Sequence, residues 1–166
     1  MIGCSPTEPS AAAAAGLAVR LSVDADPAGV STASAWIRAL AESLDFPADD
    51  VYRLDLCLSE IVANIVEHSG VGRRAGRIAL EASAPPGAAS MSVSVADDGA
   101  AFDPLSAPPP AGFADPARIQ IGGLGIHLVR SYADDCGYER LAEQNVFRFA
   151  IRRATGGAAG AGQPER

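Results

Sequence analysis

SEIVANIVEH (Ser59–His68) lies in the most regular apolar pattern of this 166-residue chain. Apolar residues recur there at steps of three and four: Val51, Leu54, Leu58, Ile61, Val62 and Ile65. This spacing predicts a helix over about residues 50–68. At about 100° per residue, Asn64 lies about 40° around that helix from Glu60, and His68 about 80°. Acid, amide and imidazole therefore share one edge beside the apolar stripe.

That edge carries groups suited to phosphoryl transfer. Asn64 presents an amide oxygen in mid-helix, where asparagine is not favoured by propensity, and Mg²⁺ prefers oxygen ligands shared with phosphates. Glu60 has the chemistry of a general base that takes a proton from an attacking hydroxyl or orients a water. The alternatives are a solvated glutamate and an asparagine that caps the helix or faces water.

Two stretches with glycines follow this helix. Asp97-Asp98-Gly99 ends an apolar run, where a carboxylate can accept a hydrogen bond from an exocyclic amine such as N6 of adenine. The alternative for Asp97 is an Asx turn. Gly122, Gly123 and Gly125 precede a helical pattern, and the free N–H groups of a helix N-terminus suit phosphate oxygens. The alternative there is a tight helix entry.

The remaining patterns predict one domain with loose ends. We expect strands over 17–23, 77–84, 90–96, 136–141 and 146–151, and further helices over about 30–44 and 122–134. Asp24, Asp26 and Pro27 are interpreted as a break after the first strand, and Pro85-Pro86-Gly87 predicts an antiparallel hairpin. Residues 97–121 form a connection typical of lids or disordered segments. Residues 1–16 and 154–166 are predicted to be disordered tails.

The charge of the chain excludes several kinds of site. A formal net charge of -7 argues against nucleic-acid and anionic-membrane partners, which need clustered positive charge. All 13 positive side chains are arginine. The absence of lysine excludes a P-loop lysine, Schiff-base chemistry and a lysine nucleophile.

The three cysteines and the apolar segments point to an intracellular protein. Cys4, Cys57 and Cys136 form no C-x-x-C pair, which disfavours a zinc site or a disulfide framework, and Cys57 is interpreted as a buried free thiol. The N-terminus lacks the pattern of a signal peptide, and no uncharged apolar run approaches about 18 residues. We expect a cytoplasmic location.

Three motifs in order resemble one known family. Residues 59–68 resemble the N box of the histidine-kinase-like (Bergerat-fold) ATPases, in the S-E-x-x-x-N-x-x-x-H form of the anti-sigma-factor serine/threonine kinases. Residues 95–104 resemble the D-x-G-x-G-F-D-P segment of that group, and residues 122–129 its G-G-x-G-x-x-L-V phosphate segment. The resemblance covers about residues 17–153, and the short chain favours the anti-sigma branch.

The resemblance implies an α+β two-layer sandwich, with a mixed, mostly antiparallel sheet, helices on one face, and ATP held under a lid at about residues 99–121. It implies that Glu60 activates a protein Ser or Thr hydroxyl and that Asn64 binds Mg²⁺. The implied nucleotide-binding residues are Asn64, His68, Asp97, Gly99, Ala101, Phe102, Gly122, Gly123, Leu124 and Gly125, with Asp97 on adenine. The implied partners are an anti-anti-sigma protein as phosphoacceptor, a sigma factor as client and a second copy of the chain.

Ala101 departs from the family pattern, which has glycine there. If the backbone needs a positive φ at this position, alanine costs about 1 kcal/mol and weakens nucleotide binding. Two other functions therefore stay open: a nucleotide-gated binding module with little kinase activity, and the detached ATPase domain of a two-component histidine kinase.

Overall fold

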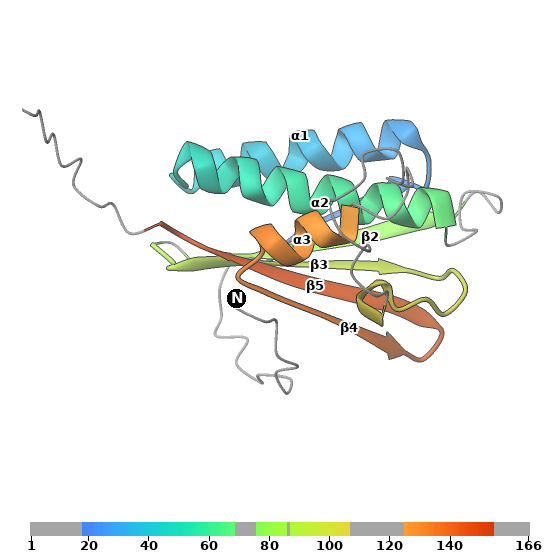
Figure 1. Ribbon diagram of the computed structural model, residues 1–166. Helices are drawn as coiled ribbons and strands as arrows, with labels where there is room; N and C mark the ends of the chain where they lie inside the picture. The colour runs from blue at the N-terminus through green and yellow to red at the C-terminus, as the bar shows by residue number, and fades with distance from the viewer. Residues whose placement is uncertain (1–17, 69–75, 86, 107–124, 155–166) are drawn as a thin grey trace, which may run out of the picture.

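The computed structural model describes residues 18–68, 76–85, 87–106 and 125–154. In these residues a five-stranded sheet forms one layer, and the helices lie together on one of its faces (Figure 1). The predicted two-layer α+β fold is confirmed. The predicted tails, most of the predicted lid, and Gly122, Gly123 and Leu124 lie outside the described residues.

The sheet is antiparallel at every described pairing. Its strands are β1 (Ala18–Asp24), β2 (Arg77–Ser83), β3 (Ser90–Asp97), β4 (Asp135–Leu141) and β5 (Gln144–Arg152), in the spatial order β1-β2-β3-β5-β4. The predicted hairpin is the β2–β3 pair. In the β3–β5 register Asp97 faces Asn145, so two polar residues meet at the end of the sheet.

The β4–β5 hairpin extends further than the sequence predicts. Leu141 pairs with Gln144, which leaves Ala142 and Glu143 as the turn, and Ala142 has a φ of 51°. β5 therefore begins at Gln144 rather than at residue 146. The two added residues place Asn145 inside the strand.

Helix α1 (Pro27–Ser43) begins three residues before the predicted start at Val30. The Asp26 side chain accepts a hydrogen bond from Gly29 N at 2.7 Å and caps the helix, and proline is well tolerated at the first helical position. The predicted break after the first strand is confirmed, because β1 ends at Asp24. Only the predicted helix start was wrong, because Asp26 and Pro27 also begin the helix. A Cβ at Gly29 would clash with the Asp24 carbonyl oxygen, so glycine allows this abrupt strand-to-helix turn.

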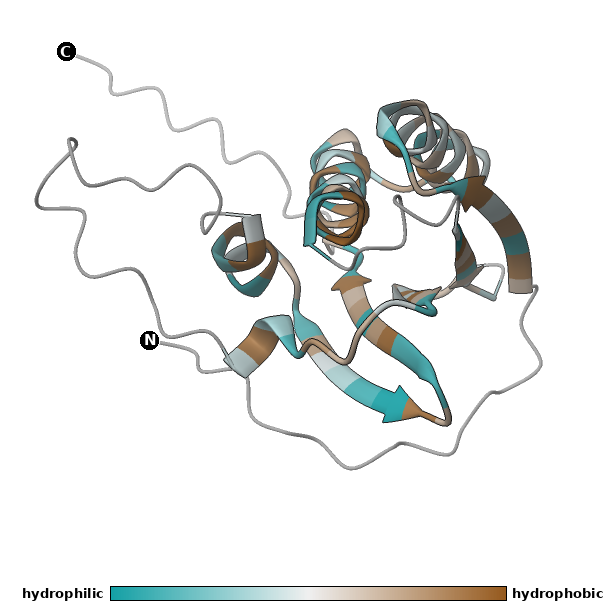
Figure 2. Cartoon of the chain, turned by 90° about the vertical axis from the view of Figure 1, so that its right-hand side faces the viewer, coloured by the Kyte–Doolittle hydropathy of each residue, from teal (hydrophilic) through white to brown (hydrophobic). Residues whose placement is uncertain are grey.

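Helix α2 (Ala48–His68) confirms the predicted helix, and its whole apolar stripe is buried: Val51, Leu54, Leu58, Ile61, Val62 and Ile65. Figure 2 shows hydrophobic residues along the side of the helices that faces the sheet, and hydrophobic residues along the strands. The described part of the third helix, α3 (Gly125–Tyr132), packs mainly against α2 and ends two residues before the prediction. A short 3-10 helix, η2 (Pro104–Ser106), was not predicted. None of the described helices is long and apolar enough to cross a membrane.

Candidate functional site

A pocket lies between α2, the start of α3 and the strand ends that carry Asp97 and Asn145. Most of its wall is apolar: Ile61, Ile65, Val95, Phe102, Pro104, Ile126 and Phe147. Its polar wall consists of Asn64, Asp97, Tyr138 and Asn145. An apolar cleft with a few converging polar groups is the usual form of a small-molecule site.

Asp97 is the last residue of β3 and is 3% exposed. Its Oδ1 accepts hydrogen bonds from Gly99 N at 2.8 Å and from Asn145 Nδ2 at 3.1 Å. The Asx turn considered from the sequence is therefore present, and it uses this one oxygen. Oδ2 accepts no hydrogen bond from a described residue and is not sealed from solvent, so it is available to a ligand.

Asn145 is the residue of this site that the sequence patterns did not reveal. It is 6% exposed, and its Nδ2 donates to Asp97 Oδ1 at 3.1 Å and to Ala100 O at 3.0 Å. Its Oδ1 accepts hydrogen bonds from the Tyr138 hydroxyl at 2.8 Å and from Arg140 Nη1 at 2.9 Å. Every donor and acceptor of this amide is therefore in use.

The segment after Asp97 is held by the same group of residues. Phe102 N donates to Asn145 Oδ1 at 3.3 Å, and Arg140 Nη1 donates to Gly99 O at 2.9 Å. Ala101 is exposed and does not line the pocket. Among the described residues, positive φ values occur at Asp45, Gly87 and Ala142, so alanine at position 101 carries no left-handed strain.

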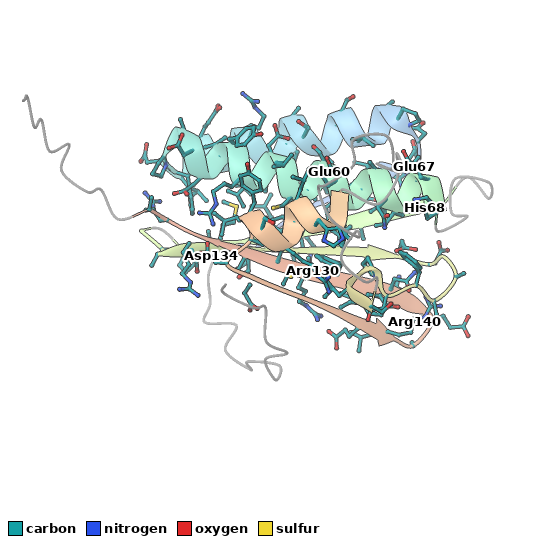
Figure 3. The ribbon with its side chains drawn as sticks, viewed as in Figure 1. Glu60, Glu67, His68, Arg130, Asp134 and Arg140 are labelled. Carbon is teal, nitrogen blue, oxygen red and sulfur yellow. The ribbon has the colours of Figure 1, made fainter. Side chains whose placement is uncertain are left out.

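Glu60 and Asn64 are half-buried on α2, and neither forms a side-chain hydrogen bond with a described residue. Asn64 lines the pocket, whereas Glu60, one turn earlier, does not. His68 is exposed at the helix end, does not line the pocket, and its Nε2 lies 3.7 Å from Glu67 Oε2. Figure 3 shows Glu60 on α2 close to α3, and His68 further along α2. Of the three residues of the predicted helix edge, only Asn64 therefore lines the pocket.

The carboxylate of Glu60 packs against the first residue of α3. A Cβ built on Gly125 would lie 2.5 Å from Glu60 Oε2 and 3.4 Å from Glu60 Cδ. Glycine at this position therefore leaves the space that the carboxylate occupies. The predicted helix edge and the predicted glycine segment meet here, whereas Gly122, Gly123 and Leu124 lie outside the described residues.

The Cys57 thiol, on the same helix, is not a nucleophile. It is fully buried, and desolvation raises its pKa to about 12, opposed by the positive charge of Arg53. The neutral thiol is therefore the stable form near neutral pH. The predicted buried free thiol is confirmed.

The residues of the pocket fit an adenine nucleotide and a magnesium ion. Asp97 Oδ2 is an unengaged acceptor beside apolar walls that suit a flat heterocycle. Asn64 offers an oxygen that no described residue occupies. In the described part of the chain no three His, Cys, Asp or Glu side chains gather as a metal site.

Sequence comparison with known proteins gives relatives of one kind. The chain is 27% identical over 121 residues to the serine-protein kinase RsbW of Listeria innocua, covering 70% of this chain and 76% of that protein. It is 33% identical over 107 residues to the serine/threonine-protein kinase BtrW of Bordetella bronchiseptica, covering 63% of this chain and 72% of that protein.

The fold comparison agrees with these relatives. A crystal structure of the RsbU and RsbW domains of Rv1364c from Mycobacterium tuberculosis matches with a TM-score of 0.60 at 17% identity. The match covers 82% of this chain and 32% of that longer chain, so it supports the fold alone. The family model of the histidine kinase-like ATPase domain matches residues 23–151. The chain therefore belongs to the histidine kinase-like ATPase domain family.

Proposed function

We propose that this chain binds Mg·ATP in the pocket between α2 and the sheet and transfers the γ-phosphate to a Ser or Thr hydroxyl of a protein partner. The observation that carries the proposal is the position of Glu60 against Gly125 at the start of α3, with Asn64 one turn further along α2. A possible base and a possible cation ligand thus lie beside the helix end that suits phosphates.

Each proposed role follows from the chemistry of the side chain. Asp97 accepts a hydrogen bond from the exocyclic amine of adenine through Oδ2, and the apolar walls, including Phe102, cover the ring. Gly99 shapes the turn that holds Asp97, and Gly125 borders the phosphates together with Gly122, Gly123 and Leu124. His68 and Ala101 also belong to the proposed nucleotide-binding set, but they lie outside the pocket wall.

In the proposed transfer step one proton moves, one bond to phosphorus forms and one breaks. The oxygen of the Ser or Thr hydroxyl bonds to the γ-phosphorus while Glu60 accepts the proton of that hydroxyl. The bond between this phosphorus and the bridging oxygen of ADP breaks. Asn64 holds the Mg²⁺, which when bound neutralises charge on the phosphate oxygens. Gly125 leaves room for the Glu60 carboxylate.

The partners are proposed from the relatives. Two relatives are named serine or serine/threonine-protein kinases. We propose that an anti-anti-sigma protein accepts the phosphate, that the chain sequesters a sigma factor, that it does so in the cytoplasm, and that it forms homodimers. The kinase relatives favour a serine or threonine acceptor over the phosphohistidine that a two-component kinase would form.

Titration calorimetry and phosphoryl transfer test the proposal together. Wild type binds Mg·ATP, Asp97→Asn and Asn64→Ala bind it more weakly, and Glu60→Gln keeps the affinity within about threefold while transfer falls by about 10²-fold to 10⁴-fold. The transfer assay uses γ-labelled ATP and a co-encoded anti-anti-sigma protein. Glu67→Gln is the matched control, because Glu67 lies on the same helix with its side chain 63% exposed.

Each possible failure has its own meaning. A wild-type protein that does not bind Mg·ATP contradicts the whole proposal. Unchanged transfer by Glu60→Gln removes only the proposed base. ATP binding with no transfer to any candidate partner favours the nucleotide-gated binding module, although Ala101, which suggested that module, is unstrained. An acid-labile product points to phosphohistidine.

A further inference from the structure

The amide of Asn145 can adopt only one orientation in its surroundings. Its oxygen side meets the Tyr138 hydroxyl, Arg140 Nη1 and Phe102 N, the last two of which can only donate. Its nitrogen side meets two acceptors, Asp97 Oδ1 and Ala100 O. Rotating the amide by 180° would set donors against donors and acceptors against acceptors, with the residue 6% exposed.

This fixed orientation determines which oxygen of Asp97 a ligand can use. Asn145 Nδ2 and Gly99 N both donate to Oδ1, at 3.1 Å and 2.8 Å, so this oxygen is held in place. Oδ2 is left as a single acceptor at the pocket. One fixed acceptor can accept a hydrogen bond from one N–H of an amine on the purine ring. It would repel a carbonyl oxygen at the same ring position.

The surrounding strands supply the rigidity. Tyr138 and Arg140 lie on β4, the neighbour of β5, and both side chains point to the face of the sheet that carries Asn145. Arg140 also donates to Gly99 O, so a single guanidinium joins the amide to the turn after Asp97. Figure 3 shows Arg140 near the end of the edge strand, away from Glu60.

We propose that Asn145 is a positioning residue for base recognition: oriented by Tyr138 and Arg140, it holds Asp97 so that Oδ2 alone reads the 6-amino group of the purine. The inference rests on the proposed function, because it concerns the same pocket. Asn145 itself acts through Asp97 and contributes to the discrimination between 6-amino and 6-oxo purines.

A thermodynamic cycle that changes the 6-amino group of the ligand and residue 145 of the protein separates positioning by Asn145 from simple structural support. Titration calorimetry compares ATP with purine riboside 5′-triphosphate, which has hydrogen in place of the 6-amino group, both with Mg²⁺. We expect wild type to bind ATP about tenfold or more tightly, the effect of one hydrogen bond to a charged acceptor. In Asn145→Ala this ratio falls to within about threefold, because the loss falls on ATP more than on the analogue.

Two further variants keep the test decisive. Tyr138→Phe removes one donor to the amide and keeps the ring, so the ratio falls part of the way; this variant decides the matter if Asn145→Ala does not fold. Glu139→Gln is the control, since Glu139 lies between the two strand residues but pairs with Arg148 on the opposite face. Its ratio matches wild type.

The outcomes distinguish the inference from the proposed function. Wild type that binds neither nucleotide overturns both. If wild type binds ATP and the analogue equally, the nucleotide site stands, but recognition of the 6-amino group by Asp97 is overturned. An unchanged ratio in folded Asn145→Ala or, failing that, in Tyr138→Phe overturns positioning and leaves the proposed function intact.

Discussion

At the sheet end of the pocket, Asp97 and Asn145 are almost completely buried and joined by a hydrogen bond. At the helix end, Asn64 of the pocket wall and Glu60, one turn away on α2, are half-buried with no hydrogen bond to a described residue. A buried polar group without partners costs free energy, so the sheet end must complete its own network. The helix end is accessible, and its groups stay available to a ligand. The sheet end is thus organised without a ligand, and under the proposed function the helix end is completed by binding.

The largest effect is expected at the helix end, from Gly125→Ala. The new Cβ would lie 2.5 Å from Glu60 Oε2, so the carboxylate must move, and phosphoryl transfer falls by about 10²-fold. The double variant with Glu60→Gln is no slower than Glu60→Gln alone, because both changes act on the same group. Gly137→Ala is the control, since a Cβ there meets no atom within 4 Å. Additive losses in the double variant would show that Gly125 acts independently of Glu60.

A stability comparison tests the difference between the two ends directly. Asn145→Ala leaves buried donors and acceptors without partners and lowers the free energy of unfolding by about 2–3 kcal/mol. Asn64→Ala breaks no described hydrogen bond and changes it by less than about 0.5 kcal/mol. Urea unfolding followed by the fluorescence of Trp36 measures both. Equal losses would mean that the two ends are equally organised.

A smaller effect is expected from restoring the family glycine with Ala101→Gly. Because Ala101 has no positive φ, glycine relieves no strain and gives the unfolded chain more freedom. The free energy of unfolding falls by about 0.4–1 kcal/mol, and the affinity for Mg·ATP is unchanged. A clear gain in affinity would show that the bound state needs a backbone conformation absent here.

The smallest effect concerns Cys57, a buried residue of α2. With a pKa of about 12, its thiol stays protonated and unmodified by iodoacetamide at pH 8 in the native protein, whereas the unfolded thiol reacts. Since folding raises this pKa from 9.0, its contribution to stability is complete below about pH 9 and is lost as the pH rises toward 12. Peptide mass spectrometry separates Cys57 from the other cysteines. Rapid native labelling would mean that α2 opens readily.

Much of the fold could be predicted because its signals are local. The stripe from Val51 to Ile65 has helical spacing, and all its predicted members are buried. The start of α1 was misplaced because Asp26 and Pro27 are equally common in turns and at helix starts. Which of the two occurs depends on the close approach of Gly29 to the end of β1.

The site was only partly predictable. Glu60 and Asn64 share a helix, so spacing alone relates them. Asn145 is separated from Asp97 by 48 positions, and its role arises from the β3–β5 register. One signal was available: Asn145 continues the inward alternation of Phe147 and Phe149. The predicted strand began two residues too late, at residue 146, and so left Asn145 out.

The turn formed by Ala142 and Glu143 has a consequence for protein engineering. Surface hairpin turns usually accept insertions, which makes them attractive places for tags and fusions. Here Asn145 follows the turn by only two positions, and its neighbours Tyr138 and Arg140 lie on the preceding strand. One inserted residue that shifted the pairing would turn the Asn145 side chain to the opposite face. This hairpin is therefore a poor fusion site, although it lies at the surface.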